Sequence, residues 1–248
     1  MTHEPFDLVI FDCDGVLVDS ERIAVRVDAR MLADLGCPFT EEEIVERFLG
    51  AAEGELVRAV EERLGRKLEP GWWKPYQRWY QEAYDAELTA VDGVAEALKE
   101  ITLPVCLASN GGHEKIARNL RTTGLHDHFE GRVFSARDVA RAKPAPDLFL
   151  HAARTMGVEP SRCAVVEDSR YGVRAARAAG MRSFGYCGGL TPAEWLEGEG
   201  TVVFDDMRSL PELLLDPPDF RFRSNGSSAN DAAHRATSKP SAAAIPCP

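Results

Sequence analysis

Residues 8–20 read LVIFDCDGVLVDS, so a run of four apolar residues leads straight into two closely spaced acids. The apolar run, Leu8 to Phe11, is typical of a strand that is buried on both faces of a sheet. Asp12 and Asp14 follow at once, ahead of Gly15. An Asp-Gly pair is common in tight turns, so these acids alone are as consistent with a turn as with catalysis. The interpretation depends on what else the chain places beside them.

Similar short apolar runs recur towards the carboxyl terminus, and helical patterns separate most of them. They lie at 105–108, 133–134, 164–166, 183–186 and 202–204. Strands that alternate with helices form a parallel sheet with helices on both of its faces. The sequence therefore predicts an α/β fold, with a Rossmann-like parallel sheet as a core domain formed by residues 1–19 and 89–215.

Residues 20–88 break this alternation, because they show helical patterns and no strand pattern. Thr40 and Glu43 form a capping-box pattern at the start of one expected helix. An aromatic stripe between Trp72 and Tyr80 is more typical of the core of a small helical bundle than of a ligand platform. We therefore expect an α-helical domain, residues 20–88, inserted into the core domain.

The composition narrows the class of protein and its partners. The chain has 29 Lys and Arg against 40 Asp and Glu, a net charge of −11, which argues against general binding of nucleic acid or of a membrane surface. Its six cysteines are scattered, and we recognise neither a signal peptide nor a membrane-spanning run, so we expect a cytoplasmic protein.

After Leu215 the composition turns to Ser, Ala, Asn and Pro, which predicts a disordered tail over residues 216–248.

Three further polar motifs accompany the two acids. They are Ser109-Asn110 after the run at 105–108, Lys143 before a proline, and Glu167-Asp168 after the run at 164–166. Each has a plain alternative, because Ser and Asn cap helices, a lysine is usually solvated, and acids favour the start of a helix. However, the carboxyl ends of parallel strands share one edge of a sheet, so the acids should meet. Carboxylates that meet repel one another unless a cation lies among them, and Mg²⁺ suits such a site.

With these motifs in this order, the sequence resembles the haloacid dehalogenase-like hydrolase superfamily, in the group that carries a helical cap domain after the first motif. The similarity covers Asp7 to Leu215, and the stretch DCDGVLVDS is its most specific part. Within the group the chain most resembles sugar-phosphate phosphatases of the 6-phosphogluconate phosphatase type, and next the β-phosphoglucomutase-like enzymes.

The resemblance implies a phosphatase mechanism with Asp12 as the covalent nucleophile. Asp12 would attack phosphorus to form an aspartyl-phosphate. Asp14 would act as general acid towards the leaving alcohol and then as general base towards water. The expected substrate is a small soluble phosphate monoester, with a sugar or sugar-acid phosphate as the preferred class, and the expected assembly is a monomer or a homodimer.

The resemblance also implies the ligands of the metal and of the phosphate. Mg²⁺ is expected on Asp12, the backbone carbonyl of Asp14, Glu167 and Asp168, where Glu167 binds directly or through water. The phosphoryl oxygens are expected to contact Ser109, Asn110 and Lys143. Metal and lysine together would neutralise the charge of the transferring group.

Two alternatives remain open at this point. The mutase-like relatives carry a histidine ten residues after the second acid, whereas this chain has Ala24 there and no histidine from Glu21 to Arg30, which favours net hydrolysis. A catalytically inactive binding or regulatory protein on the same fold is the other alternative, and the completeness of the motifs argues against it. Substrate selection is assigned to Glu21 and Arg47, although Arg47 is equally consistent with a solvated helix residue.

Overall fold

The computed structural model describes residues 6–49 and 53–217, and its centre is one parallel sheet of six strands. The strands are β1 (Leu8–Phe11), β2 (Val105–Ser109), β3 (Val133–Ser135), β4 (Cys163–Glu167), β5 (Arg182–Tyr186) and β6 (Thr201–Phe204). Their order is β3-β2-β1-β4-β5-β6, and every neighbouring pair is parallel. The predicted α/β fold with a Rossmann-like sheet is confirmed. Because β1 lies between β2 and β4, the three strands that precede the polar motifs are neighbours.

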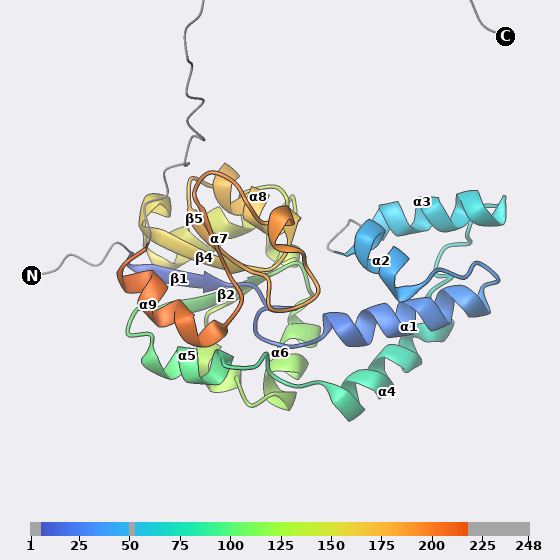
Figure 1. Cartoon of the computed structure of the whole chain (residues 1–248), viewed down its shortest axis with the longest axis horizontal. Helices are drawn as coiled ribbons and strands as arrows, with labels where there is room; N and C mark the ends of the chain where they lie inside the picture. The colour runs from blue at the N-terminus through green and yellow to red at the C-terminus, as the bar shows by residue number, and fades with distance from the viewer. Residues whose placement is uncertain (1–5, 50–52, 218–248) are drawn as a thin grey trace, which may run out of the picture.

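Helices cover both faces of this sheet, as Figure 1 shows. They are α5 (Val94–Glu100), α6 (His113–Thr122), α7 (Asp147–Met156), α8 (Arg170–Ala178) and α9 (Leu210–Leu215). Side chains alternate along β1, so Val9 and Phe11 pack with α5, α6 and α9, whereas Leu8 and Ile10 pack with α7 and α8. Burial on both faces explains why β1 reads as a continuous apolar run.

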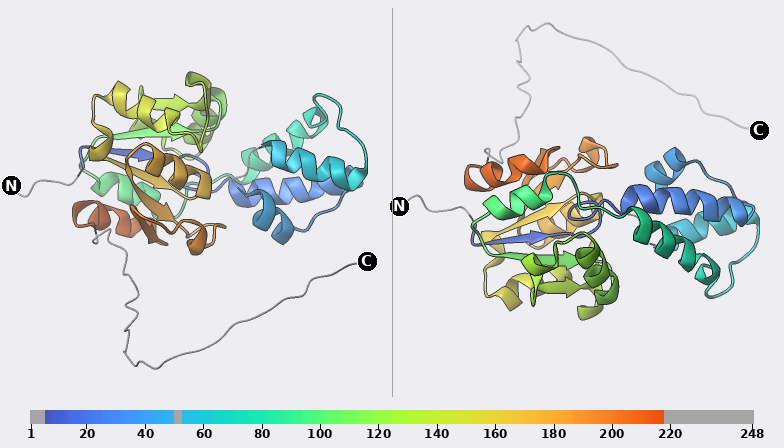
Figure 2. Two further views of the ribbon diagram at one scale, coloured as in Figure 1. Left: turned by 90° about the horizontal axis from the view of Figure 1, so that it is seen from above. Right: turned by 90° about the horizontal axis from the view of Figure 1, so that it is seen from below.

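Four α-helices of the described residues lie between β1 and α5 in the chain and form a separate lobe beside the sheet (Figures 1 and 2). They are α1 (Glu21–Asp34), α2 (Glu41–Phe48), α3 (Glu53–Leu64) and α4 (Gln77–Glu87). The two connections to the sheet run side by side, because the N–H of Asp19 donates to the carbonyl of Thr89 at 3.0 Å. The lobe thus lies at the end of the sheet towards which β1 points.

The helical lobe has an apolar core of its own, which includes Leu32, Ile44 and Val60. The predicted capping box is present: the side chain of Thr40 accepts from the N–H of Glu43, and the Glu43 side chain accepts from the N–H of Thr40. A capping box satisfies two N–H groups that a helix start leaves free, so it defines where α2 begins.

The aromatic stripe belongs to the bundle core for the most part. Tyr76 is buried in the lobe, and Trp79 and Tyr80 pack against the same cluster. Trp73 differs, because 38% of it is exposed. It precedes the 3₁₀ turn that contains Pro75, and α4 begins only at Gln77. Proline removes an N–H donor and favours the first turn of a helix, which places the start of α4 after the two tryptophans.

Short 3₁₀ helices complete the described structure. They are η1 (Lys74–Tyr76), η2 (His126–Phe129), η3 (Ala136–Asp138), η4 (Pro160–Arg162), η5 (Ala193–Trp195) and η6 (Met207–Ser209). Within the described residues, none of the helices has the length and apolar character that crossing a membrane requires. Residues 218–248 of the predicted tail lie outside the described residues, so that expectation stays a prediction.

Candidate active site

The polar motifs that follow β1, β2 and β4 surround one cavity of about 200 Å³. It is lined by Asp12, Asp14, Glu21, Ser109, Asn110, Lys143, Glu167, Asp168, Ser169 and Tyr171. Register explains the convergence: Phe11 pairs with Leu107 on one side and with Val166 on the other, so the chain leaves all three strands at the same level. The sequence pointed to this edge, and the structure brings these side chains together there.

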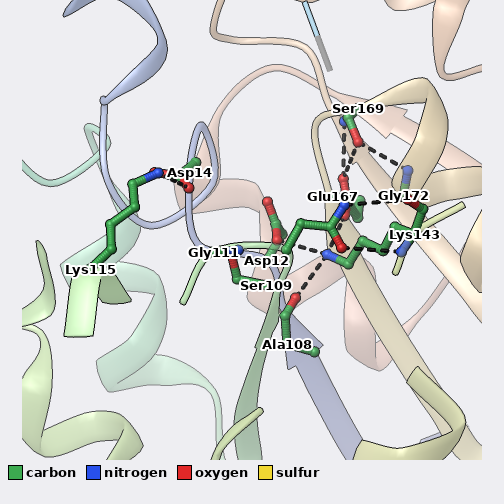
Figure 3. A network of polar contacts seen from close by, with 11 residues as sticks. Asp12, Asp14, Ala108, Ser109, Gly111, Lys115, Lys143, Glu167, Ser169 and Gly172 are labelled. Atoms are coloured by element: carbon green, nitrogen blue, oxygen red, sulfur yellow. Dashed lines mark hydrogen bonds and ion pairs between the residues drawn. The ribbon is translucent and has the colours of Figure 1, made fainter. Parts of the chain in front are cut away.

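Lys143 is the buried cation of the site, and its side chain is only 3% exposed. Its ammonium donates to Asp12 Oδ1 at 2.7 Å, to Glu167 Oε1 at 2.6 Å and to the carbonyl of Ala108 at 2.8 Å (Figure 3). These contacts use all three ammonium donors. Burial works to lower the pKa of Lys143, but the two carboxylates outweigh it and the pKa is raised. The lysine is therefore a fixed positive charge between the acids.

Asn110 holds the segment that carries Lys143. Its side-chain amide donates to the carbonyl of Lys143 at 3.3 Å, and its side-chain oxygen accepts from the N–H of Lys143 at 3.1 Å. Ser109 Oγ accepts from the N–H of Gly111 at 3.0 Å, so its own hydroxyl proton is available to a ligand. Of these two residues, Ser109 is free to donate to a phosphate through its side chain, whereas the amide of Asn110 already positions the lysine.

Asp12, Glu167 and Asp168 form a buried cluster whose ligand oxygens lie within 4.8 Å of one another. Asp168 Oδ2 and Glu21 Oε2 are both buried and, with both carboxyls ionised, have no hydrogen-bond donor among the described residues, although the two carboxyls lie close enough to share a proton. Burial, and then the Glu21 carboxylate, raise the pKa of Asp168 well above its usual range. Gly15, with φ +76°, makes room, because a Cβ there would lie 1.9 Å from Asp168 Oδ2.

This cluster fits a hard divalent cation. Oxygens of carboxylates are the ligands that Mg²⁺ prefers, and a cation would satisfy the unpartnered oxygen of Asp168. Glu167 is held more fully by the protein, because its Oε2 accepts from the N–H and the hydroxyl of Ser169 at 3.1 and 2.9 Å. Gly172 permits this arrangement, since a Cβ there would lie 1.8 Å from the Glu167 carboxyl carbon.

Asp14 lies in a different electrostatic environment from Asp12. Its Oδ1 accepts from Ser20 Oγ at 2.7 Å, and its Oδ2 accepts from the ammonium of Lys115 at 2.7 Å. Burial tends to raise the pKa of Asp14, but the Lys115 ammonium and its hydrogen bond outweigh this and lower it. Burial raises the pKa of Asp12 to about 7, although Lys143 acts against it. Two acids two residues apart are thus tuned in opposite directions.

Sequence reasoning missed Lys115 and Tyr171, and it noted Ser169 beside the acids without giving it a role. Lys115 lies in the first turn of α6, directly after the Ser109-Asn110 motif, and Ser169 and Tyr171 follow Glu167-Asp168 directly. Each therefore follows a strand end that the motifs had already singled out. A search for donors in the first helical turn after each strand would have found them.

The two residues assigned to substrate selection lie in different places. Glu21 lines the cavity, and burial raises its pKa to about 7. Arg47 is exposed in α2, where its guanidinium lies 5.0 Å from the ring centre of Phe48 and 5.3 Å from that of Phe39. It is not among the residues that line the cavity. The structure therefore favours the solvated alternative for Arg47.

Comparison with known proteins agrees with this site. A model of the haloacid dehalogenase-like hydrolase family matches residues 6–180. The chain is 33% identical over 208 residues to 6-phosphogluconate phosphatase of Escherichia coli, which covers 84% of this chain and 94% of that one. The chain therefore belongs to the haloacid dehalogenase-like hydrolases. The predicted similarity to the phosphatases of this family is confirmed.

Solved structures of the family have the same fold. A conserved haloacid dehalogenase-like protein of Agrobacterium tumefaciens is 40% identical with a TM-score of 0.77, and the match covers 84% of this chain and 97% of that one. A family hydrolase of Deinococcus radiodurans, solved with bound phosphate and sodium, is 29% identical with a TM-score of 0.71 and covers 87% of this chain and 100% of that one. The fold extends along nearly the whole length of both.

Proposed function

We propose that this protein is a Mg²⁺-dependent phosphate-monoester hydrolase that acts on a small metabolite, a sugar or sugar-acid phosphate, through an aspartyl-phosphate on Asp12. The observation that carries the proposal is the hydrogen bond of 2.7 Å between the buried ammonium of Lys143 and Asp12. A buried cation bonded to a strand-end carboxylate is suited to a nucleophile that must approach a dianionic phosphate. Similarity to 6-phosphogluconate phosphatase supports the substrate class.

The residues of the chain divide the reaction between them. Lys143 holds Oδ1 of Asp12, which orients the carboxylate and leaves Oδ2 to attack phosphorus. Lys143 and the hydroxyl of Ser109 offset charge on the phosphoryl oxygens. Asp14 gives a proton to the leaving alcohol, which it must first take up because Lys115 lowers its pKa, and it later takes one from the attacking water. Its separate position, between Ser20 and Lys115, keeps it from competing with Asp12 for Lys143.

A metal would bind to Asp12, the backbone carbonyl of Asp14 and Asp168, with Glu167 contributing through water because its own oxygens are already hydrogen-bonded. When bound, Mg²⁺ neutralises charge on the transferring phosphoryl group. We further propose that residues 20–88 act as a cap domain over the core domain, 1–19 and 89–215. The free thiols of the described cysteines support a cytoplasmic location.

The test is phosphate release from p-nitrophenyl phosphate and from a panel of phosphorylated sugars and sugar acids. Activity should require Mg²⁺, vanish in EDTA and return when Mg²⁺ is restored, while Ca²⁺ should support it poorly because it tolerates a looser geometry. Asp12→Asn should abolish turnover and leave the Tm nearly unchanged. Full activity in EDTA, or clear activity of Asp12→Asn, would contradict the proposal.

Net hydrolysis rather than phosphoryl transfer within a sugar is expected. Ala24 lies in α1, where the mutase-like relatives carry a histidine, and Asp14 is available to activate water. The discriminating assay follows glucose 6-phosphate and free phosphate from β-glucose 1-phosphate with a trace of the 1,6-bisphosphate. Faster formation of glucose 6-phosphate would favour the mutase, and no reaction of any phosphate ester would favour an inactive binding protein.

A further inference from the structure

We propose that Lys115 is a positioning residue that holds the carboxyl of Asp14 in the direction it needs to transfer protons; this inference rests on the proposed function. Lys115 lies in α6, a helix of the sheet-bearing part of the chain, and is separated from Asp14 by 101 positions in sequence. Figure 3 shows that it approaches Asp14 from the side opposite to Lys143. The site therefore contains two lysines, each bonded to a different member of the Asp12 and Asp14 pair.

The geometry around Asp14 restrains both carboxyl oxygens. Ser20 Oγ donates to Oδ1 and Lys115 Nζ donates to Oδ2, each at 2.7 Å. The two donors come from different segments of the chain. A carboxyl with one donor on each oxygen has little freedom to rotate about its terminal bond. Ser20 lies where the chain enters the helical lobe, whereas Lys115 lies on α6. Lys115 is thus the partner that ties Asp14 to α6.

The surroundings of Lys115 distinguish it from an ordinary surface lysine. Its side chain is 43% exposed and that of Asp14 is 26% exposed, so the pair lies between solvent and the buried cluster. The hydrogen bond to Asp14 uses one of the three ammonium protons. A lysine that stays charged can restrain Asp14 without taking part in proton transfer.

Orientation matters here because Asp14 acts twice. In the first step a bond forms between Asp12 and phosphorus, the ester P–O bond breaks, and the proton of Asp14 passes to the leaving oxygen. In the second step water bonds to phosphorus, the acyl phosphate bond breaks, and Asp14 takes a proton from that water. Lys115 keeps its own protons throughout. Misplacement by about 1 Å can cost on the order of 100-fold in such steps.

A consequence separates this role from simple structural support. Nitrophenolate leaves as a stable anion, so the first step with p-nitrophenyl phosphate needs no proton from Asp14, whereas a sugar phosphate does need it. The second step is the same for both substrates. Loss of Lys115 should therefore lower kcat for both, but should lower kcat/KM only for the sugar phosphate, because kcat/KM reports the steps up to release of the first product.

The experiment compares Lys115→Met, which keeps the length of the side chain without its charge, with Lys115→Arg in the full chain with Mg²⁺. For Lys115→Met we expect kcat to fall about 10- to 100-fold on both substrates, and kcat/KM for p-nitrophenyl phosphate to stay within about threefold. A burst of nitrophenolate should precede the slow steady state. Lys115→Arg should recover most of the rate. Lys115→Gln serves as the neutral variant if Lys115→Met folds poorly, as judged by its Tm.

Arg118→Met is the matched control. Arg118 is on the same helix, one turn further, and pairs with Asp85 of α4 and not with Asp14. It should change kcat/KM for the two substrates in the same proportion. If Lys115→Met also lowers kcat/KM for both substrates equally and without a burst, the positioning role is overturned. If neither substrate is hydrolysed by the wild-type protein, the proposed function itself fails.

A further pair of substrates separates positioning from recognition of the substrate's charge. Glucose 6-phosphate and 6-phosphogluconate both carry phosphate on a primary alcohol, but the latter also carries a carboxylate. A positioning role predicts that Lys115→Met lowers kcat/KM for the two by similar factors. A loss confined to 6-phosphogluconate would show that Lys115 binds the substrate's second anionic group and would overturn the positioning role.

Discussion

The edge of the sheet and the helical lobe contribute to the same cavity in very different ways. From the sheet side, Lys143 is buried and bonded to Asp12, Glu167 and a carbonyl. From the lobe, Glu21 enters the cavity with one buried carboxyl oxygen that has no hydrogen-bond partner among the described residues. The cation on the sheet side is thus fixed by three hydrogen bonds, whereas the lobe supplies a carboxyl oxygen that still lacks a donor.

The lobe and the sheet-bearing part share apolar packing through Ile23 and Val27 of α1, but their polar contacts lie near the surface. Arg118 of α6 pairs with Asp85 of α4, and both are exposed. Tyr171 donates to Glu55 of α3 at 3.5 Å, close to the limit for a hydrogen bond. Exposed pairs of this kind contribute about 0–1 kcal/mol each. The polar pairs therefore add little to the attachment of the lobe, which depends more on the apolar packing of Ile23 and Val27.

The largest expected effect comes from the sheet side. Lys143→Met would leave Asp12 and Glu167 buried together without their shared cation. We expect kcat/KM to fall about 1,000-fold, because the fixed positive charge that orients Asp12 beside the transferring group is lost. The same change should destabilise the fold by about 3 kcal/mol or more, since it breaks a buried ion pair. Urea unfolding and turnover measured below the Tm would separate the two effects. Retention of wild-type activity would show that the bonds of Lys143 to Asp12 and Glu167 are not needed for catalysis.

An intermediate effect is expected where the lobe meets the metal cluster. Glu21→Gln removes an ionisable carboxyl beside Asp168 without changing the shape of the side chain. We expect the affinity for Mg²⁺ to fall about tenfold, as for other residues that support a metal ligand. Arg47→Ala is the matched control from the same lobe, and it should leave that affinity unchanged because Arg47 lies outside the cavity. Calorimetric titration with Mg²⁺ measures both, and an equal loss of affinity in the two variants would contradict a specific role of Glu21.

The smallest expected effect lies within the lobe. Burial raises the pKa of Asp28 from 3.8 to about 6, although its hydrogen bond from Tyr80 acts against this. Because the folded pKa is the higher one, this carboxyl supports the fold while protonated, and its contribution is lost as the pH rises from about 4 through about 6. Asp28→Asn should therefore raise the free energy of unfolding by on the order of 1 kcal/mol near pH 8 and change it little near pH 4. A gain that is the same at both pH values would contradict a buried charge as the cause.

Several features of the fold were readable from local patterns. The run Leu8 to Phe11 predicted a strand because a central parallel strand is buried on both faces, and it is β1. Thr40 and Glu43 predicted a helix start because their hydrogen bonds span only three positions. The strand-end acids were expected to meet because parallel strands end on one edge, and the order of β2, β1 and β4 makes their strands neighbours.

Tertiary structure alone decided how charges are paired. The bonds of Lys143 to Asp12 and of Lys115 to Asp14 span 131 and 101 positions, and no sequence periodicity reports on contacts of that separation. The same applies to Arg47, because a helical pattern indicates on which face of a helix it lies but not which residues that face contacts. Burial then sets the outcome: desolvation and a specific partner shift the pKa values of Asp12 and Asp14 in opposite directions, although both acids stand in one short motif.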